Sequence, residues 1–371
     1  MMKKVKLLHI QLLPLLSGVQ NMMIQLLKGL NPETFEIIVI SRDNGPMVDE
    51  IKKNGWQHIT LNSLTRNISV LDLKAFIDLF IILRKIKPDI VHTHSSKTGF
   101  IGRITAKLAG VKLVIHTLHG FSFHPFQPKV IRFFYQTLES FAAMFADYNV
   151  FVNQFEKDYA IHKLGFNSKK TLSIYNGIKV YPKTKEYPFD LTFFNQPLKV
   201  VSVSRFSKQK NIIDTIQQAI EIVKSKSNVT FTFYGDGELF DDAQKLIESN
   251  VVPDKIFLPG WASNIQETLL KYDVFLLNSL WEGLPISILE AMSVGLPVIA
   301  SNIKGNNELI NEDNGWLIDL QNPNSLNAII KYILKNPEIL KEKGLQSVKK
   351  VTYIFKEELF INRYLELYNK T

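Results

Sequence analysis

The sequence predicts an α/β protein of two domains, each built on a parallel sheet that helices cover on both faces. Short apolar runs rich in β-branched residues alternate with longer amphipathic segments along the chain, which is typical of consecutive β-α-β units. This alternation restarts near residue 180, and 371 residues are enough for two domains. The charge of the chain also changes near that point.

The two halves of the chain carry different charge. Residues 1–178 hold 22 Lys and Arg against 12 Asp and Glu, a net charge of +10, whereas residues 179–371 hold 22 against 23, a net charge of −1. A basic module suits an anionic partner, such as nucleic acid, an acidic membrane or a phosphorylated substrate. The chain has no cysteine, which excludes disulfides, thiol catalysis and cysteine-bound metal centres.

The elements of the first half are expected as follows. Strands are predicted at residues 5–10, 35–40, 57–61, 89–92, 112–117 and 148–152, with helices at 19–30, 70–85, 98–109 and 128–145. The richest apolar segment, 71–83, contains three charged residues and is shorter than the ~20 residues that cross a membrane. The first residues also lack the features of a secretion signal. We therefore expect a cytoplasmic protein.

A connector rich in proline and tyrosine, residues 181–197, precedes the second series of elements. Strands are predicted at residues 198–204, 229–234, 255–258, 274–278, 297–300 and 316–318, with helices between them. A last helix over 353–368 carries Tyr353, Phe360, Tyr364 and Leu367 on one face, which suits docking on the rest of the protein. Ligands of such sheets bind beyond the carboxyl ends of the strands, so two such domains predict an active site in the cleft between them.

The most informative segment is WEGLPISILEAM, residues 281–292, which follows the predicted strand 274–278. Glu290 is expected within a helix and Glu282 on the loop before it. The backbone amides of Gly283 and Leu284 would lie ahead of the helix N-terminus, where anions bind. One carboxylate alone would be an ordinary surface residue, but the whole string in this context predicts a ligand site.

Other strand ends also carry polar residues. Arg205 and Lys210 follow the strand 198–204 and suit phosphate oxygens, although a solvated basic loop is the alternative. Gly18 follows the first strand at a turn into a helix, where backbone amides can approach a phosphate, although a plain turn is the alternative. Neither a Walker motif nor G-x-G-x-x-G is present, so a P-loop fold and dinucleotide binding are not expected.

The histidines of the first half form two groups. His119 and Gly120 fall just after the strand 112–117, where a catalytic side chain can reach a ligand. His92 and His94 share one strand face, but a metal there would need a third ligand that the sequence does not indicate. His94, Ser95 and Lys97 read as a polar strand end with a cation near a helix start, which suits a phosphorylated partner. No Asp-x-Asp occurs, and we expect no metal and no other cofactor.

Together these segments resemble the family 4 retaining glycosyltransferases of GT-B fold, over nearly the whole chain. The E-x7-E motif matches Glu282 and Glu290, and the Arg…Lys pair matches Arg205 and Lys210. Further matches are the His-Gly loop at 119–120, Asn-Gly-Ile at 176–178 and the glycine loops at 235–238 and 305–309. The first half is similar to capsular and other surface polysaccharide glycosyltransferases. Many relatives have Gly-Gly where this chain has Ser17-Gly18.

The resemblance implies roles for these residues. Arg205 and Lys210 would neutralise the leaving nucleoside diphosphate, Glu290 would accept from the ribose hydroxyls, and His119 would lie beside the transferred sugar. Glu282, with the amides of Gly283 and Leu284, would hold that sugar, and Gly18 and Gly235 would complete the donor site. His94, Ser95 and Lys97 would contact the acceptor.

The resemblance also implies an overall activity. The expected enzyme is a metal-independent, retaining hexosyl- or N-acetylhexosaminyltransferase that uses a nucleotide sugar, with UDP as the expected nucleotide, in capsule, O-antigen or exopolysaccharide assembly. Residues 1–178 with the helix 353–371 would bind the acceptor, a saccharide on a polyprenyl diphosphate, and residues 179–352 would bind the donor. The sheets of the two Rossmann-like domains would face each other across the cleft, and the last helix would return to the first domain.

The basic first half suggests a place for this activity. Residues 128–145 combine Lys129 and Arg132 with several aromatic residues, which suits a helix at a membrane interface, although an ordinary packing helix is the alternative. We expect the protein on the inner face of the cell membrane, bound peripherally to its anionic surface, with no nucleic-acid partner. A nucleotide-sugar 2-epimerase of GT-B fold is the alternative enzyme, and a two-domain solute-binding protein is the alternative outside catalysis.

Overall fold

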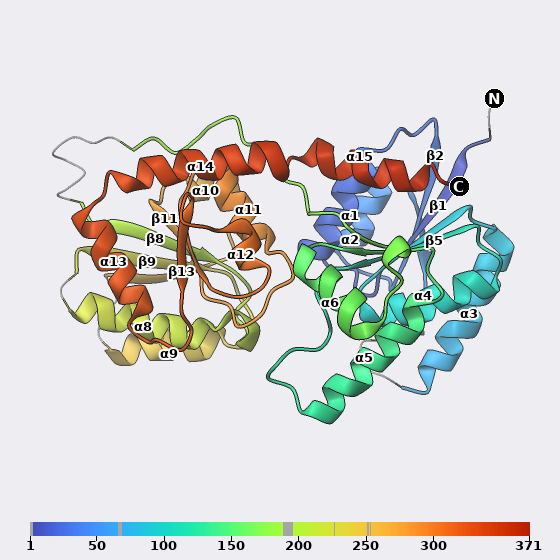
Figure 1. Cartoon of the computed structure of the whole chain (residues 1–371), viewed down its shortest axis with the longest axis horizontal. Coiled ribbons are helices and arrows are strands. Elements are labelled where there is room, and N and C mark those ends of the chain that lie inside the picture. The colour runs from blue at the N-terminus through green and yellow to red at the C-terminus, as the bar shows by residue number, and fades with distance from the viewer. Residues whose placement is uncertain (1–2, 66–68, 188–195, 226, 251, 253) are drawn as a thin grey trace. The chain divides into compact units, whose positions relative to one another are not determined.

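The computed structural model describes residues 3–65, 69–187, 196–225, 227–250, 252 and 254–371. The chain forms two compact units, which we call unit 1 and unit 2 (Figure 1). Unit 1 contains Met1–Gly177 and Glu358–Thr371, and unit 2 contains Ile178–Glu357. Part of the predicted connector, residues 188–195, lies outside the described residues.

Unit 1 is built on a parallel sheet of seven strands in the order β3-β2-β1-β4-β5-β6-β7. The strands are β1 Val5–Ile10, β2 Phe35–Ser41, β3 Gln57–Thr60, β4 Ile90–His94, β5 Leu113–Leu118, β6 Tyr148–Phe151 and β7 Thr171–Ser173. Six of them lie where the sequence predicted strands. The seventh, β7, has three residues, which is too few to show a periodicity.

Helices connect the strands of unit 1, as expected for β-α-β crossovers. They are α1 Gly18–Lys28, α2 Pro46–Lys53, α3 Leu71–Ile86, α4 Ser96–Leu108, α5 Lys129–Ala143 and α6 Gln154–Leu164, with a short 3₁₀ turn η1 at Ser168–Lys170. Helix α4 packs against both α3 and α5, so these three helices form one layer (Figure 1). The apolar side chains of β1, β2 and β4 are buried under this cover.

Unit 2 is built on a parallel sheet of six strands in the order β10-β9-β8-β11-β12-β13. The strands are β8 Leu198–Val203, β9 Val229–Tyr234, β10 Ile256–Gly260, β11 Val274–Leu277, β12 Val298–Ser301 and β13 Gly315–Ile318. The helices are η2 Lys208–Lys210, α8 Ile212–Lys224, α9 Phe240–Asn250, α10 Ile265–Leu269, α11 Ile286–Ser293, α12 Asn306–Leu309, α13 Ser325–Lys335 and α14 Ile339–Ile354. The predicted α/β class with two parallel sheets is confirmed.

The predicted helix over 353–368 is wrong at its start. Helix α14 ends at Ile354, and α15 is a separate helix, Glu357–Tyr368. Between them the backbone pairs with Ile178, which donates to the Phe355 carbonyl at 2.7 Å and accepts from the Glu357 amide at 3.1 Å. A helix cannot continue through residues whose backbone groups bond to another segment.

Helix α15 returns the chain to unit 1, as the sequence predicted (Figure 1). Phe360, Tyr364 and Leu367 are buried, but Tyr353 lies on α14 and is 71% exposed, so it takes no part in the docking. Tyr368, at the end of α15, is buried and its ring lies 6.0 Å from that of Phe35 on β2. Among the described residues, no helix is both long enough and apolar enough to cross a membrane.

Candidate active site

The candidate donor residues of unit 2 lie after three neighbouring strands. The order β9-β8-β11 places the carboxyl ends of these strands side by side, because all three run parallel. Arg205 and Lys210 follow β8, Gly235 follows β9, and Glu282 follows β11. The strand pattern of the sequence therefore brings the predicted donor residues of these three loops to one edge of one sheet.

Glycine is required where two of these loops meet. Gly235 has φ +139°, and a Cβ there would lie 1.8 Å from the carbonyl oxygen of Ser204. The loop after β9 thus lies directly on the loop after β8. Gly305, after β12, has φ +93°, and a Cβ there would lie 2.2 Å from the Gly283 carbonyl oxygen. Both loops pack backbone to backbone, which positions Arg205 and the E-x7-E segment.

Lys210 and Glu282, which the sequence placed in separate roles, form an ion pair at 2.5 Å. The pair is poorly accessible, with side-chain exposures of 18% and 6%. The two loops are also tied by Gln209, whose side chain donates to the Trp281 carbonyl at 2.9 Å and whose carbonyl accepts from the Leu280 amide at 2.8 Å. The Lys210 ammonium is therefore held at the E-x7-E segment.

The ion pair that Arg205 forms is more exposed to solvent than the pair of Lys210 and Glu282. Its guanidinium lies 3.0 Å from the Glu238 carboxylate, and both side chains are more than half exposed. Exposed pairs of this kind contribute about 0–1 kcal/mol, so Arg205 can exchange Glu238 for another anion at little cost. Glu238 belongs to the glycine loop at 235–238 that the sequence analysis named.

Glu290 lies on α11, as predicted, and Pro285 precedes the first turn of this helix. Burial raises the pKa of the Glu290 carboxyl to about 7. This carboxyl therefore changes charge near neutral pH. Gly283 and Leu284 are buried and take part in interactions within the chain.

The candidate residues of unit 1 lie at the carboxyl ends of β1, β4 and β5. Gly18 is the first residue of α1 and is exposed, and the Ser17 hydroxyl before it bonds to Gln20. His94 ends β4 and is buried, whereas His119 follows β5 and is partly exposed. Because β1, β4 and β5 are neighbours in the sheet, these groups share one edge.

Ser95 connects β4 to α4 in an unusual conformation. Its φ is +64° and its ψ is 154°, a region that glycine occupies but that costs other residues about 1–3 kcal/mol. Lys97, in the first turn of α4, lies 2.5 Å from the Asp72 carboxylate of α3 and donates to the Thr65 hydroxyl at 3.3 Å. The predicted acceptor residues are thus joined to the start of α3.

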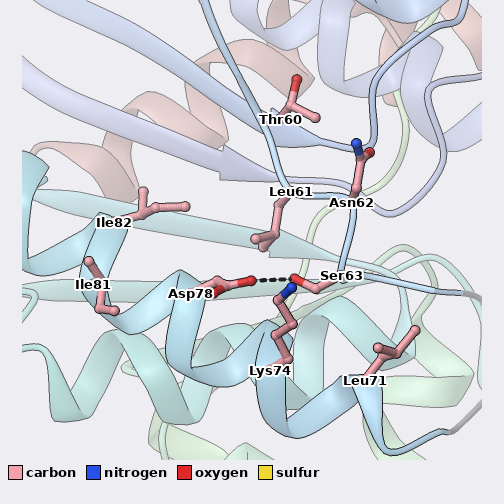
Figure 2. Close-up of a pocket in the computed structure, with 9 residues that line it drawn as sticks. All are labelled: Thr60, Leu61, Asn62, Ser63, Leu71, Lys74, Asp78, Ile81 and Ile82. Carbon is pink, nitrogen blue, oxygen red and sulfur yellow. Dashed lines mark hydrogen bonds between the residues drawn. The ribbon is translucent and has the colours of Figure 1, made fainter.

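A shallow pocket of about 620 Å³ lies beside this contact, between α3 and the segment after β3 (Figure 2). Leu71, the neighbour of Asp72, lines it. Its polar groups include Asp78, which accepts from the Ser63 hydroxyl at 2.9 Å, and Lys74 from the same helix (Figure 2). This pocket was not predicted from the sequence, because its lining comes from separate segments that the fold brings together.

His9 is the residue that the sequence analysis missed. It is paired in register with His92, and its ring nitrogen Nδ1 lies 2.9 Å from Nε2 of His94. His94 in turn bonds to His119 at 3.1 Å. One nitrogen each of His9, His92 and His94 lie within 4.8 Å of one another, so His9 is the third ring that the sequence did not indicate. His9 could have been found from the sequence, because the first and fourth strands are adjacent in a doubly wound sheet, which places His9 beside His92.

The comparisons with known proteins identify the family. The model for Glycosyl transferases group 1 matches residues 183–349, and the model for Glycosyltransferase Family 4 matches residues 16–180. A relative from Escherichia coli, UDP-Gal:alpha-D-GlcNAc-diphosphoundecaprenol alpha-1,3-galactosyltransferase, is 38% identical over 340 residues, which cover 88% of each chain. N,N'-diacetylbacillosaminyl-diphospho-undecaprenol alpha-1,3-N-acetylgalactosaminyltransferase of Campylobacter jejuni is 25% identical over 316 residues, covering 80% of this chain and 81% of that one.

Solved structures show the same architecture. A glycosyltransferase from Rickettsia africae superposes with a TM-score of 0.79 at 22% identity, covering 99% of this chain and 98% of that one. Anabaena HepE in complex with UDP and glucose gives 0.80 at 17% identity, covering 99% and 100%. The fold is thus that of the GT-B transferases. The chain belongs to the family 4 glycosyltransferases, as the sequence motifs predicted.

The histidines of unit 1 make the stability of the protein depend on pH. Burial lowers the pKa of six of them from the ordinary value of 6.5: His9 to about 3, His119 to about 4, His92, His94 and His116 well below it, and His58 below it. The unfolded chain therefore binds more protons than the folded chain below pH 6.5. The free energy of unfolding should fall as the pH falls from 6.5 toward 4, by up to about 1.4 kcal/mol per pH unit for each histidine.

Urea denaturation at pH 7.5, 6.5 and 5.5 measures this effect. We expect little change between the first two values and a clear loss of stability at the third. His162 on α6 is exposed and does not belong to the buried histidines, so His162→Ala is the control variant. Equal stability at pH 7.5 and 5.5 would contradict the neutral, buried state of the cluster.

Proposed function

We propose that the protein transfers a hexosyl or N-acetylhexosaminyl residue from a UDP-sugar to a saccharide carried on a polyprenyl diphosphate, with retention of the anomeric configuration and without a metal ion. The observation that carries this proposal is the convergence of Arg205, Lys210 and the E-x7-E segment at one edge of the unit 2 sheet. The names of the E. coli and C. jejuni relatives support it, because each describes an α-1,3 transfer to a diphosphoundecaprenol-linked sugar.

In this proposal unit 2 binds the donor. The Arg205 guanidinium and the Lys210 ammonium face the diphosphate, and Glu290 accepts hydrogen bonds from the ribose hydroxyls. Glu282 lies next to Lys210 and contacts the transferred sugar. Fixed cations placed where charge develops can replace a metal ion, because they stabilise the leaving diphosphate without reorganisation.

The chemical step follows from this arrangement. The bond between the anomeric carbon and the diphosphate oxygen breaks, and UDP leaves with the bonding electron pair. The acceptor hydroxyl attacks the oxocarbenium-like carbon from the same face and gives its proton to the departing diphosphate oxygen. Attack from the same face keeps the anomeric configuration, so an α-linked donor gives an α-linked product. His119 is proposed to lie beside the sugar during this step.

Unit 1 is proposed to bind the acceptor near His94, Ser95 and Lys97. The strained backbone of Ser95 supports this, since such conformations persist mainly at functional sites. Lys97 supplies a cation for the acceptor diphosphate. To do so, its ammonium group must break its ion pair with Asp72 or contact both anions at once. The pocket beside α3 is lined by Leu71, the sequence neighbour of Asp72, and is proposed to receive part of the acceptor.

Unit 1 is also proposed to rest on an anionic membrane. Helix α5 exposes large apolar side chains over its length: Val130 at 80%, Phe133 at 70%, Phe134 at 49% and Phe141 at 46%. Helix α3, in the same layer, exposes Leu73 at 70%, Ile77 at 49% and Ile81 at 59%. Exposed apolar side chains in such numbers indicate an interaction surface, and the net charge of +10 in residues 1–178 favours an acidic lipid surface.

The activity is tested with the purified full chain, UDP-sugars and a synthetic GlcNAc-diphosphate lipid. UDP-galactose is the first donor to test, because the E. coli relative is named for it. We expect an α-linked disaccharide lipid, with undiminished turnover in excess EDTA since Arg205 and Lys210 supply the positive charge. Loss of turnover in chelator that Mg²⁺ or Mn²⁺ restores would disprove metal independence, and a β-linked product would disprove retention.

A second prediction separates the two glutamates. Glu290→Ala should raise the Kd for UDP about tenfold, because a hydrogen bond to a charged group contributes about 1.5–3 kcal/mol. Glu282→Ala should lower kcat and should not weaken UDP binding, since it removes a contact to the sugar and releases Lys210. Calorimetric titration with UDP and steady-state kinetics measure both variants.

Proton release gives an independent measure of the role of Glu290. Its pKa of about 7 leaves the carboxyl partly protonated at neutral pH, and ribose hydroxyls that donate to it favour the charged form. UDP binding at pH 7 should therefore release protons, seen as a dependence of the binding enthalpy on the buffer. Glu290→Gln should lose this part of the dependence. Equal proton release by the wild type and Glu290→Gln would remove the carboxyl from the ribose site.

A third prediction concerns the membrane. Each cation near an acidic surface contributes about 1 kcal/mol, so Lys129→Glu with Arg132→Glu should weaken binding to phosphatidylglycerol vesicles at least about tenfold. Phe133→Ser should also weaken it, including at high salt, where charge is screened. Lys331→Glu with Lys335→Glu on α13 makes the same charge change in unit 2 and is the control. Co-sedimentation that responds equally to both double variants would show that only net charge matters.

A further inference from the structure

The buried histidines of unit 1 form one continuous hydrogen-bond chain that ends at His119. Starting there, His119 Nε2 pairs with His94 Nδ1 at 3.1 Å, and His94 Nε2 pairs with His9 Nδ1 at 2.9 Å. His9 Nε2 then pairs with the Tyr368 hydroxyl of α15 at 3.3 Å. The strands β1 and β4 and the helix α15 are thus linked through side chains alone.

The chain continues beyond Tyr368. Its hydroxyl also pairs with His92 Nδ1 at 2.7 Å, and His92 Nε2 pairs with the Thr117 hydroxyl at 2.8 Å. Thr117 pairs in turn with the Tyr364 hydroxyl at 2.8 Å. Apart from His119, every member is at most 2% exposed, so water does not compete for these groups.

The number of protons on the side chains limits how donors and acceptors can alternate along this hydrogen-bond chain. Burial lowers the pKa of each histidine in it, so at neutral pH each ring carries one N–H and one acceptor nitrogen. Each hydroxyl also supplies one proton. We take each hydrogen bond to hold one proton, and each hydroxyl between two histidines or between His92 and Tyr364 to accept only one hydrogen bond. All the donors must then point in the same direction along the hydrogen-bond chain.

The two directions differ at the buried end. If all donors point toward Tyr364, its own O–H has no acceptor, since Thr117 is its one polar partner among the described residues. A buried unsatisfied donor costs about 1–3 kcal/mol. If all donors point toward His119, Tyr364 donates to Thr117 and every buried group is satisfied. His119 Nε2 then accepts from His94, which places the His119 proton on Nδ1.

We propose that this hydrogen-bond chain holds His119 in the tautomer with its proton on Nδ1, so that Nδ1 donates a hydrogen bond to the transferred sugar. No described residue bonds to His119 Nδ1, which leaves this nitrogen for a ligand. His94, His9 and Tyr368 are positioning residues in this arrangement, because they act on the sugar through His119. The second half of the proposal rests on the proposed function, and the first half, the tautomer, does not.

Two matched variants on α15 test the direction of the hydrogen-bond chain. Tyr368→Phe removes the hydroxyl that joins His9 to His92. The N–H donors of His94 and His9 can then take either direction along the hydrogen-bond chain, so the second His119 tautomer becomes populated. Tyr364→Phe makes the same chemical change on the same helix, but Thr117 then ends the chain and donates to His92, so the direction is kept. We therefore expect different results from two substitutions that bury the same phenyl ring.

The primary measurement is two-bond ¹H–¹⁵N NMR of histidine-labelled full chain, with the His119 signals assigned from His119→Gln. The wild type and Tyr364→Phe should show His119 with Nδ1 protonated, and Tyr368→Phe should show both tautomers. An Nε2–H tautomer in the wild type, or identical spectra of the two variants, would overturn the proposal. One equivalent of zinc in the purified protein would also overturn it, because a metal would take the nitrogens that form the chain.

Kinetics test the link to the sugar. In Tyr368→Phe, kcat should fall in proportion to the population that keeps Nδ1–H, which is about twofold for equal tautomers, with KM unchanged. Tyr364→Phe should keep the wild-type kcat. A tautomer shift without a change in kcat would refute the contact of Nδ1 with the sugar, whereas absence of transferase activity in the wild type would refute the proposed function and leave the NMR result valid.

Discussion

All the candidate site residues depend on one constraint, which is that every strand pair of both sheets runs parallel. A parallel pair needs a crossover, and each crossover begins at the carboxyl edge of the sheet, so the loops that follow the strands meet there. The loops after β8, β9 and β11 carry the cations and carboxylates of unit 2 in this way. The same constraint gathers Gly18, His94 and His119 in unit 1. An antiparallel hairpin in either sheet would send alternate loops to the opposite edge.

The charges at the unit 2 edge are paired within the protein, and the two pairs differ in how easily they separate. Arg205 and Glu238 are exposed to water, so their attraction is screened and an arriving diphosphate can replace Glu238 at little cost. Lys210 and Glu282 are largely buried, and separating them would leave charges in a medium that stabilises them poorly. The proposed site therefore has one mobile cation and one fixed cation, and the fixed one keeps its position relative to the carboxylate beside the sugar.

The sequence predicted the strands and the presence of two parallel sheets well, because buried parallel strands are continuous apolar runs whose length can be read locally. It also placed Glu290 on a helix and Glu282 on the preceding loop. It could not predict the break between α14 and α15, because that break arises from backbone pairing with Ile178, which precedes Phe355 by 177 residues in the sequence. The pairing of Lys97 with Asp72, and the exposure of Tyr353, are likewise set by contacts between distant segments.

The histidine cluster shows why such contacts matter for chemistry. A ring nitrogen buried without a partner is costly, so four histidine rings can share one region only if their neighbours satisfy both nitrogens of each buried ring. Within unit 1 the histidines bond to one another and to Thr117, and the Tyr368 hydroxyl of α15 completes the bonding of His9 and His92. Helix α15 reaches them only after the chain has completed unit 2. The docking of α15 and the hydrogen bonding of His119 are therefore coupled. In the proposed arrangement, a change on α15 alters the proton position on His119 without any change in the residues that are proposed to contact the sugar.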